Sequence, residues 1–517
     1  MRIALRKRHY IIASAVIILI VSYFIGESIL SSKIEKAIKT ELSSQLIIDY
    51  EVFDFSLFKR QVVLQQVKLL PKNEVGVNET FEIEFDKFLV RGFSLWKFLI
   101  KDQISIKEIN FLHPQIVYTI QQDEKREESH ATPIKVDKSV RVNRFRIENA
   151  EVHIYDKVNK DSLLFETAQL NFALDQLKID ENSLQNKIPF VYDDYSLSLG
   201  DSFYRLSDFE NLRFTSFQST TDATIIEHLS ILTRYSKDEL QKHLLVERDH
   251  FEIDIPRLSI KEQSFGFEED STFYFRSPEV NFQSVNMKIY RDKLTADDET
   301  HKKLYSKMLR ELNMYLSLDQ VFVENAAIAY SEKVNEGMDA GTVSFYKLNA
   351  NIQNLGNTYA PKVNTQIDID AIFMKQTPIE VQWAFDVHNL DDQFIFKAVL
   401  GKLPAMDMNP FSQPNLKIKL NGELLKTYFT IGGNHSTGNI DMKMSFSDFN
   451  VEVLSGDGQR KNKVLSAIAD IFIKRDSDSS EDDFREISKN EVERDPTKSV
   501  FNFLWQNVKA ALIGVMT

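Results

Sequence analysis

The sequence contains no cysteine and has few residues of several other kinds. Without cysteine, a disulfide scaffold, a cysteine-ligated zinc or iron–sulfur site and a thiol nucleophile are all excluded. The 16 glycines and 12 prolines among 517 residues exclude collagen-like and glycine-rich architectures. Tryptophan is scarce, with 3 residues, whereas phenylalanine is abundant, with 38. The length predicts several domains or one long repetitive unit.

The sequence also lacks an excess of basic residues, because 63 Lys and Arg face 76 Asp and Glu and the net charge is −13. A nucleic-acid partner is therefore not expected, since phosphate affinity comes from clustered cations. No phosphate-binding loop, nucleophile elbow or metalloprotease motif is present. His228, His243 and His250 are too irregularly spaced to act together as ligands on one helix face. We predict no catalytic residues, no metal site and no cofactor, and hence no enzyme.

The sequence has only one long apolar run, Tyr10–Ile25. At 1.5 Å per residue it covers about 24 Å, close to the hydrocarbon thickness of a bilayer. The basic residues Arg2, Arg6, Lys7 and Arg8 precede it and place that side in the cytoplasm. We predict an uncleaved transmembrane anchor with the rest of the chain exported. A cleaved signal peptide remains an alternative, because Gly26 and Ser28 form a weak cleavage site.

Behind the run, Ser31–Leu46 has helical spacing, and then the hydrophobic pattern changes to period two. Apolar and polar side chains alternate, for example, along Phe81–Asp86, Phe251–Ile255 and Val381–Val387. Such alternation predicts strands with one apolar and one solvated face. The predicted fold is mainly β: a long open antiparallel β-groove with a few amphipathic helices and one N-terminal transmembrane helix. Candidate groove-lining residues are Phe81, Ile83, Phe85, Phe251, Ile253, Val381, Trp383 and Phe385.

Helical patterns interrupt the strands. We expect helices in Phe93–Ile100, Thr221–Leu245 (with a break at Ser236), Asp298–Tyr315 and Lys463–Ile473.

The sequence contains a short internal repeat. Glu148-Asn149-Ala150 followed by Lys157-Val158-Asn159 recurs as Glu324-Asn325-Ala326 followed by Lys333-Val334-Asn335. A third relative is Ile104–Ile120. Each copy reads as a strand, a tight corner and a second strand, which predicts a repetitive sheet that grows by adding strands.

The C-terminus has an apolar stripe at helical spacing behind Pro496. One interpretation is a helix that plugs the end of the sheet. The other is an interfacial helix that contacts a membrane. Candidate membrane-contact residues are Phe501, Leu504, Trp505, Val508 and Leu512.

The predicted organisation along the chain has seven parts. They are a cytoplasmic cap and anchor (1–30), an N-terminal module (31–120), a polar linker (121–139), a second sheet segment (140–300), a third sheet segment (301–475), an acidic loop (476–495) and a C-terminal amphipathic helix (496–517).

The first 120 residues resemble the N-terminus of the AsmA-like family of bacterial envelope proteins. The elements that carry the resemblance are, in order, the basic cap and anchor, the amphipathic helix, the hairpin ending in Val62–Leu70, the strand Phe81–Val90, the helix beginning at Phe93–Trp96, the strand Ile104–Ile109 and the corner Phe111–Ile116. The resemblance implies a long β-groove lined with apolar side chains. It also implies an inner-membrane protein with most of its chain in the periplasm, and no catalytic residues.

Two functions follow as hypotheses. The first is phospholipid transfer or outer-membrane homeostasis, with membrane phospholipids as partners and acyl chains lying on the apolar face, where each methylene gains about 0.8 kcal/mol on leaving water. The second is a structural or assembly factor that binds strands of outer-membrane or other envelope proteins by β-augmentation.

Overall fold

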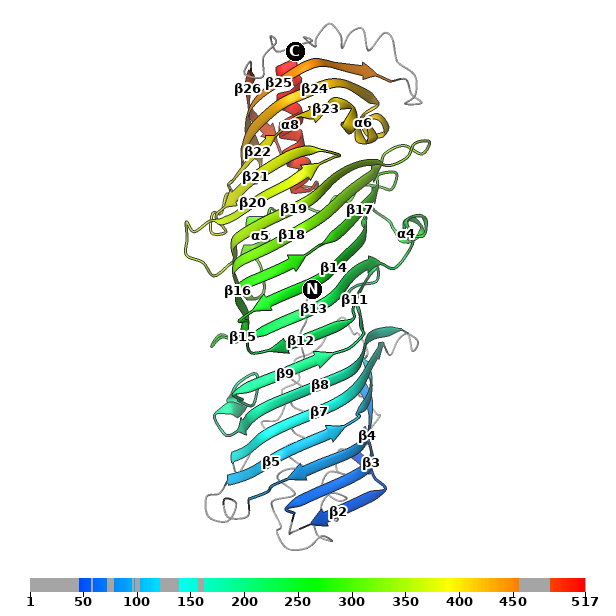
Figure 1. The fold of residues 1–517 in the computed structure, drawn as a ribbon, viewed down its shortest axis with the longest axis vertical. Helices are drawn as coiled ribbons and strands as arrows, with labels where there is room; N and C mark the ends of the chain where they lie inside the picture. The colour runs from blue at the N-terminus through cyan, green and yellow to red at the C-terminus, as the bar shows by residue number, and fades with distance from the viewer. Residues whose placement is uncertain are drawn as a thin grey trace. The chain divides into compact units, whose positions relative to one another are not determined.

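The computed structural model describes residues 46–56, 59–71, 79–94, 97, 103–120, 139–156, 162–454 and 484–516. It is mainly β, with 26 strands in a large mixed, mostly antiparallel sheet and few helices (Figure 1). The chain divides into two compact units. The first contains Met1–Leu206 with Leu212–Ile226, and the second contains Ser207–Asn211 with Glu227–Thr517.

The first unit contains the strands from β1 to β10 together with β12. Their bounds are β1 Leu46–Asp49, β2 Val52–Ser56, β3 Gln61–Pro71, β4 Glu79–Arg91, β5 Gln103–Leu112, β6 Gln115–Ile120, β7 Ser139–Asp156, β8 Leu163–Ile179, β9 Asp194–Leu199, β10 Ser202–Arg205 and β12 Ser216–Thr220, with a short 3-10 helix η2 at Ser183–Gln185. Strands β11 (Glu210–Phe214) and β13 (Ala223–Thr233) have residues in both units.

The second unit contains the strands from β14 to β26 and most of the helical segments. The strands are β14 Asp249–Lys261, β15 Ser264–Phe267, β16 Phe273–Gln283, β17 Asn286–Asp292, β18 Tyr315–Lys333, β19 Gly341–Gly356, β20 Thr365–Phe373, β21 Thr377–Phe385, β22 Phe394–Leu400, β23 Leu403–Pro404, β24 Ile418–Gly433, β25 Thr437–Val453 and β26 Arg485–Glu493. The helices are α4 Lys237–His243, α5 Tyr305–Arg310, η3 Ala405–Met408, α6 Asn409–Leu416 and α8 Val500–Met516.

The sheet is mixed rather than wholly antiparallel. Strand β4 pairs antiparallel with both β5 and β6, and these two strands pair parallel with β7. In the second unit β14 pairs antiparallel with β16 and β17, which pair parallel with β18. From β18 the antiparallel order continues through β19, β20, β21, β22, β24, β25 and β26. Thus the prediction of a mainly β fold is confirmed, and the expected antiparallel sheet is a mixed, mostly antiparallel one.

The internal repeat corresponds to a duplicated corner in the sheet. Asn149 and Asn325 both have positive φ, at 54° and 53°, at the register shift between β7 and β8 and between β18 and β19. The Asn149 amide donates to Asn171 Oδ1 at 2.9 Å, and the Asn325 amide donates to Asn349 Oδ1 at 3.0 Å. Asparagine tolerates this left-handed conformation better than most residues, so the sequence repeat fixes the position of a β-bulge.

The neighbouring strands share this corner in both copies. His113 and Ser284, also with positive φ, donate their amides to the carbonyls of Glu148 and Glu324 at 2.8 Å each. Asn110 and Asn281 donate their side-chain amides to the carboxylates of the same two glutamates, at 2.9 Å each. The third relative, Ile104–Ile120, is the β5–corner–β6 part of the first copy, so it neighbours β7 in space.

Several expected helices differ from the structure. Half of the predicted helix Thr221–Leu245 is strand β13, because its segment ATIIEHLSILT is rich in β-branched residues that favour strands. Only Lys237–His243 is helical, and it begins with a capping box formed by Ser236 and Glu239. The stripe in Asp298–Tyr315 forms only the short α5. The expected helix Lys463–Ile473 lies outside the described residues, as does most of Phe93–Ile100.

Three further expectations concern segments near the termini and the linker. The anchor Tyr10–Ile25, the helix Ser31–Leu46 apart from its last residue, and residues 121–138 of the linker lie outside the described residues. The expected acidic loop 476–495 contains strand β26, whose Ile487 packs on the core of the second unit while its backbone pairs with β25. The predicted C-terminal helix is present as α8.

Candidate functional site: one apolar face of the sheet

In the first unit the strand register brings apolar side chains into rows that cross the sheet on one face. One row consists of Phe55, Val62, Val90, Ile109, Phe145, Leu174 and Tyr195, each paired with the next. A second row consists of Phe53, Leu64, Phe88, Phe111, Ile147, Phe172 and Leu197. All but Leu197 belong to one hydrophobic cluster. Period-two alternation in every strand, held in register, therefore produces one continuous apolar face.

Aromatic rings connect these rows in the first unit. The ring of Phe111 lies 5.5 Å from Phe85, 4.7 Å from Phe88 and 5.9 Å from Phe145, and Phe145 lies 6.3 Å from Phe172. Such tilted and edge-on ring pairs contribute stability beyond that from the apolar area that they bury. Among the described residues, side chains from outside the strands that pack on this cluster are Tyr50, Phe93, Leu184, Phe190 and Tyr192.

The second unit has an equivalent row. Ile260, Val280, Val321, Ile352, Ile367, Trp383, Phe396, Ile431 and Ile440 are paired in this order from β14 to β25. Trp383 is at its centre and makes ring contacts with Tyr305 at 5.2 Å and Phe396 at 5.5 Å. Burial raises the pKa of Tyr305 above its ordinary value, which keeps its hydroxyl neutral on this face.

The groove-lining candidates differ in how far they are covered. Phe85 is buried in the cluster of the first unit, and Ile83 packs against it. Val381, Trp383 and Phe385 are buried, at 8%, 5% and 4% exposure. Phe81, Ile83, Phe251 and Ile253 are partly buried. The predicted groove-lining residues therefore range from buried to partly exposed.

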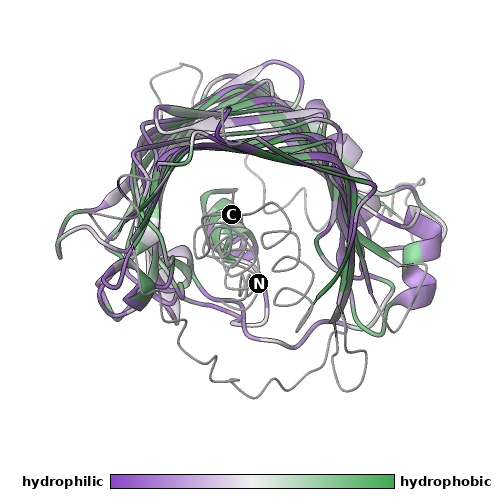
Figure 2. Cartoon of the chain, turned by 90° about the horizontal axis from the view of Figure 1, so that it is seen from below, coloured by the Kyte–Doolittle hydropathy of each residue, from purple (hydrophilic) through white to green (hydrophobic). Residues whose placement is uncertain are grey.

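Helix α8 lies on the apolar face of the second unit. Phe503, Leu504, Ala511 and Val515 are buried and share one cluster with residues of β21 to β25. Val508 and Leu512 also pack against this cluster. Figure 1 shows α8 behind strands β20 to β25, and Figure 2 shows the helix from its end. This is the packing that the plug interpretation requires; Phe501, by contrast, is 61% exposed and Trp505 is partly exposed.

Glycines allow α8 to approach the sheet closely. A Cβ atom at Gly438 of β25 would lie 2.6 Å from Asn507 Oδ1, and one at Gly514 would lie 2.3 Å from Ile487 Cδ1. The sequence pattern did not predict these two close approaches, because each glycine is far along the chain from the residue that it faces.

Ion pairs hold the segment that leads into α8. Lys498 lies 2.8 Å from Asp297 and 3.8 Å from the buried Glu247, which also pairs with Lys293 at 2.7 Å. The hydrogen bond with Lys498 lowers the pKa of Asp297, and the same bond raises the pKa of Lys498. The Lys302 amide also donates to the carbonyl of Pro496 at 2.7 Å. The sequence analysis did not predict that these charges would pair with one another.

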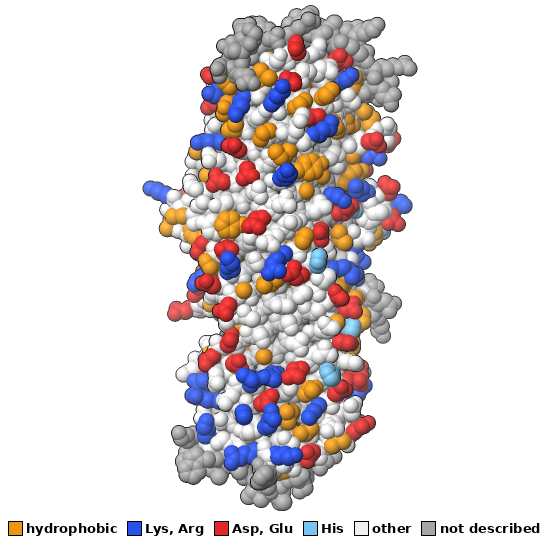
Figure 3. Space-filling model, viewed as in Figure 1, with side chains coloured by type: hydrophobic (Ala, Val, Ile, Leu, Met, Phe, Trp, Pro, Cys, Tyr) orange, Lys and Arg blue, Asp and Glu red, His pale blue; other side chains and the backbone are white. Residues whose placement is uncertain are grey.

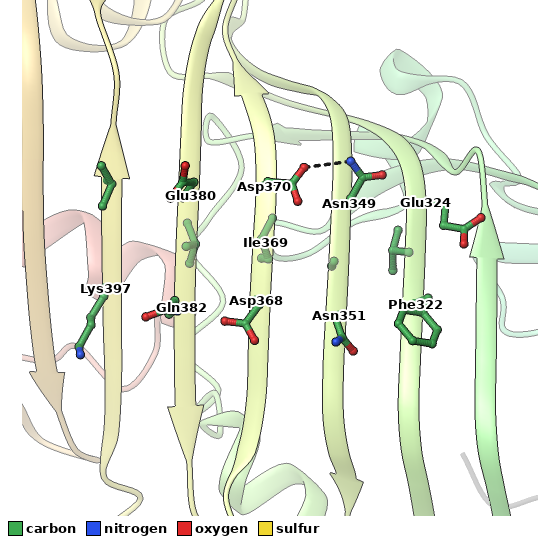
Figure 4. Close-up of a pocket in the computed structure, with 14 residues that line it drawn as sticks. Phe322, Glu324, Asn349, Asn351, Asp368, Ile369, Asp370, Glu380, Gln382 and Lys397 are labelled. Carbon is green, nitrogen blue, oxygen red and sulfur yellow. Dashed lines mark hydrogen bonds between the residues drawn. The ribbon is translucent and has the colours of Figure 1, made fainter.

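The opposite face of the sheet carries many charged side chains. Figure 3 shows acidic and basic side chains on the face turned to the viewer, interspersed with hydrophobic ones. In the second unit this face has a shallow concavity of about 680 Å³ over β18 to β22 (Figure 4). Four carboxylates and one lysine line it, namely Glu324, Asp368, Asp370, Glu380 and Lys397. Asn349 donates to Asp370 Oδ2 at 2.9 Å.

Two common structural features are absent from the described part of the chain. No group of three or more His, Cys, Asp or Glu side chains there is arranged to hold a metal ion. No helix there is both long enough and apolar enough to span a membrane.

Comparisons with known proteins identify no relative. No family model matches the sequence, and no curated protein matches it. Among solved structures, the chain resembles "Crystal Structure of Pseudomonas aeruginosa OccK8 (OprE)" with a TM-score of 0.11 and 7% identity, over 79% of this chain and 92% of that chain. A TM-score this low carries no argument about fold or function.

Proposed function

We propose that the apolar face of the sheet binds the acyl chains of phospholipids, in a protein that serves phospholipid transfer or outer-membrane homeostasis. The observation that supports this proposal is the continuity of the apolar rows across the strands of each unit, opposite a charged face. An acyl chain gains about 0.8 kcal/mol per methylene on leaving water and requires no directed polar contact. The phosphate headgroup then stays in solvent at the rim.

The cellular setting is part of the same proposal. It rests on the resemblance of the first 120 residues to the AsmA-like family and on the basic cluster before Tyr10–Ile25. The chain would be anchored once in the inner membrane, with most of its residues in the periplasm. A cytoplasm-specific reporter fused after Thr517 should then be inactive, and an active reporter would refute the topology.

Adjacent residues of β8 provide a matched test of lipid binding. Phe172 packs on the apolar cluster of the first unit, whereas Ala173 pairs with Arg146 and Ser196 and is partly exposed. The lipids that copurify with the full-length protein would be extracted and quantified by mass spectrometry. We expect Phe172→Asp to lower the bound phospholipid several-fold and Ala173→Asp to leave it unchanged. Circular dichroism would first establish that both variants are folded. Equal lipid content in two folded variants would refute the proposal.

The alternative of β-augmentation receives less support. Among the described residues β26 pairs with β25 alone, so its second edge is a place where an added strand would bind. However, the sequence of β26, REISKNEVE, is rich in charged residues, which protein edges use to prevent strand addition. Crosslinks from β26 to nascent outer-membrane proteins would support this alternative.

A further inference from the structure

Helix α8 has a second side whose residues are exposed or partly exposed. Phe501, Trp505, Lys509 and Ile513 follow one another at intervals of four residues and therefore lie along one side of the helix. Phe501 and Ile513 are 61% and 57% exposed, Lys509 is exposed and Trp505 is partly exposed. We call these four residues the outer stripe. The opposite side of α8, with Phe503, Leu504 and Ala511, is buried against the sheet.

The outer stripe is continuous with the apolar face of the sheet. The ring of Phe501 lies 6.4 Å from that of Trp383, in an edge-on arrangement, and Trp383 in turn contacts Tyr305. Since α8 covers Trp383 and Phe385, a ligand on this part of the second unit would meet the helix instead of those strands. In this part of the second unit, the apolar side chains that remain exposed are therefore those of α8.

Charge distinguishes the outer stripe from a simple apolar patch. Lys509 is the only charged residue of α8, and within the described part of the chain it forms no ion pair. A cation that lies between Trp505 and Ile513 along one side of a helix is suited to an amphiphile that has an anionic head and an apolar tail. Tryptophan also favours the boundary between such groups, because its ring is apolar and its N–H is polar.

We propose that the outer stripe is a binding site for a single anionic phospholipid, with the phosphate at Lys509 and an acyl chain along Trp505 and Phe501. This inference rests on the proposed function, since it names the lipid class and its position in the second unit. It differs from membrane docking, because one lipid molecule occupies the site while α8 stays on the sheet.

The affinity test uses the full-length protein and water-soluble lipids below their micelle concentration. Dihexanoyl-phosphatidylglycerol and dihexanoyl-phosphatidylcholine would be titrated while tryptophan emission is recorded. We expect the anionic lipid to shift the emission to the blue, and we expect no shift in Trp505→Phe. Lys509→Gln should lower the affinity for the anionic lipid about fivefold, because a single lysine near an anionic headgroup contributes about 1 kcal/mol. The affinity for the zwitterionic lipid should fall less than twofold. Equal weakening of both lipids, or no response to monomeric lipid in a protein that binds vesicles, would overturn the proposal.

A crosslinking test separates this inference from the proposed function. p-Benzoylphenylalanine would replace Trp505, Phe172 or, as a control on the charged face, Lys397 in the full-length protein. Lipid adducts at the first two positions and none at the third support both ideas. Adducts at position 172 without adducts at position 505 would overturn the outer-stripe site and leave the proposed function standing. Absence of adducts at both positions would overturn both.

Discussion

The two copies of the corner have the same backbone but different side chains on the apolar face. The equivalent strands are β4, β5, β6, β7 and β8 in the first copy and β14, β16, β17, β18 and β19 in the second, as their pairing shows. Five residues of the corner are retained: Asn110 and Asn281, Glu148 and Glu324, Asn149 and Asn325, Ala150 and Ala326, Asn171 and Asn349. His113 and Ser284, which contribute their backbone amides, differ. The backbone geometry therefore depends on a small set of polar contacts.

The apolar rows, in contrast, differ in side-chain volume. Phe145 and Phe172 of the first copy are at the positions of Val321 and Ala350 in the second. The first copy fills its face with its own aromatic rings, whereas the second presents smaller side chains. The volume of the side chains on the apolar face can thus differ while the corner stays the same.

The largest loss of stability is expected from a substitution in the aromatic rows of the first copy. Phe145→Ala removes a buried ring that contacts Phe111 and Phe172, so we expect it to lower the free energy of unfolding by about 3–5 kcal/mol. Val321→Ala at the equivalent position should lower it by only about 2 kcal/mol, because fewer carbons are lost. Urea denaturation of the full-length protein, with hydrogen exchange read on β7 and β18, would measure both. Equal losses would contradict the difference in packing.

The second largest loss of stability is expected at the corner asparagines, and it should be equal in the two copies. Asn149→Val and Asn325→Val place a β-branched residue at positive φ and remove the residue best suited to that conformation, so each should cost about 2 kcal/mol. Asn149→Gly and Asn325→Gly should be nearly neutral, because glycine adopts positive φ readily. The same denaturation measurement applies. A large cost in one copy and none in the other would show that the corners are not equivalent.

The sequence predicted the parts of the fold that depend on local pattern. Alternation along Val381–Val387 identified a strand and its buried face, and the Glu-Asn-Ala repeat identified the corner. The parallel pairing of β5 and β6 with β7 was not predictable, because strand direction depends on a crossover that leaves no periodic signal. The helix predicted over Thr221–Leu245 failed in its first half, where Ile225 and Ile226 fit a strand as well as a helix.

The candidate site was predictable only in part. The pattern identified Trp383 and Phe385 as apolar-face residues but gave no information about what covers them. Their contact with α8 joins positions more than a hundred residues apart in the chain, and tertiary packing determines such contacts. The membrane-contact residues of α8 stay a prediction for Phe501 and Trp505, whereas Leu504 is buried against the sheet.

A smaller loss of stability is expected from breaking the ion pair between Asp297 and Lys498, which lies beside the start of α8. The pKa of Asp297 is lowered in the folded protein, so its contribution is present above about pH 4–5 and is lost as the pH falls through its folded value. The pKa of Lys498 is raised, so its contribution is present below about pH 10 and is lost at higher pH.

Because the Asp297 side chain is 60% exposed, the Asp297–Lys498 pair should contribute less than about 1 kcal/mol. Asp297→Asn should remove that amount at pH 7 and less at pH 3, because the Asp297 carboxylate loses its charge as the pH falls through its lowered pKa. Hydrogen exchange of the first turn of α8, measured at both pH values, would test this. A loss at pH 3 as large as at pH 7 would show that the substitution acts through something other than charge.

The smallest effect should come from the charged face, where the two copies differ in charge but not in backbone. Ser198 of the first copy is at the position of Asp370 in the second, and each lies within hydrogen-bond distance of the equivalent asparagine, Asn171 or Asn349. Ser198→Asp and Asp370→Ser should each change the free energy of unfolding by less than about 0.5 kcal/mol, because exposed residues outside the core rarely matter more. The concavity over β18 to β22 would then owe its acidic lining to something other than folding. A loss above about 1 kcal/mol in Asp370→Ser, with none in Ser198→Asp, would instead show that Asp370 stabilises the second corner by holding Asn349.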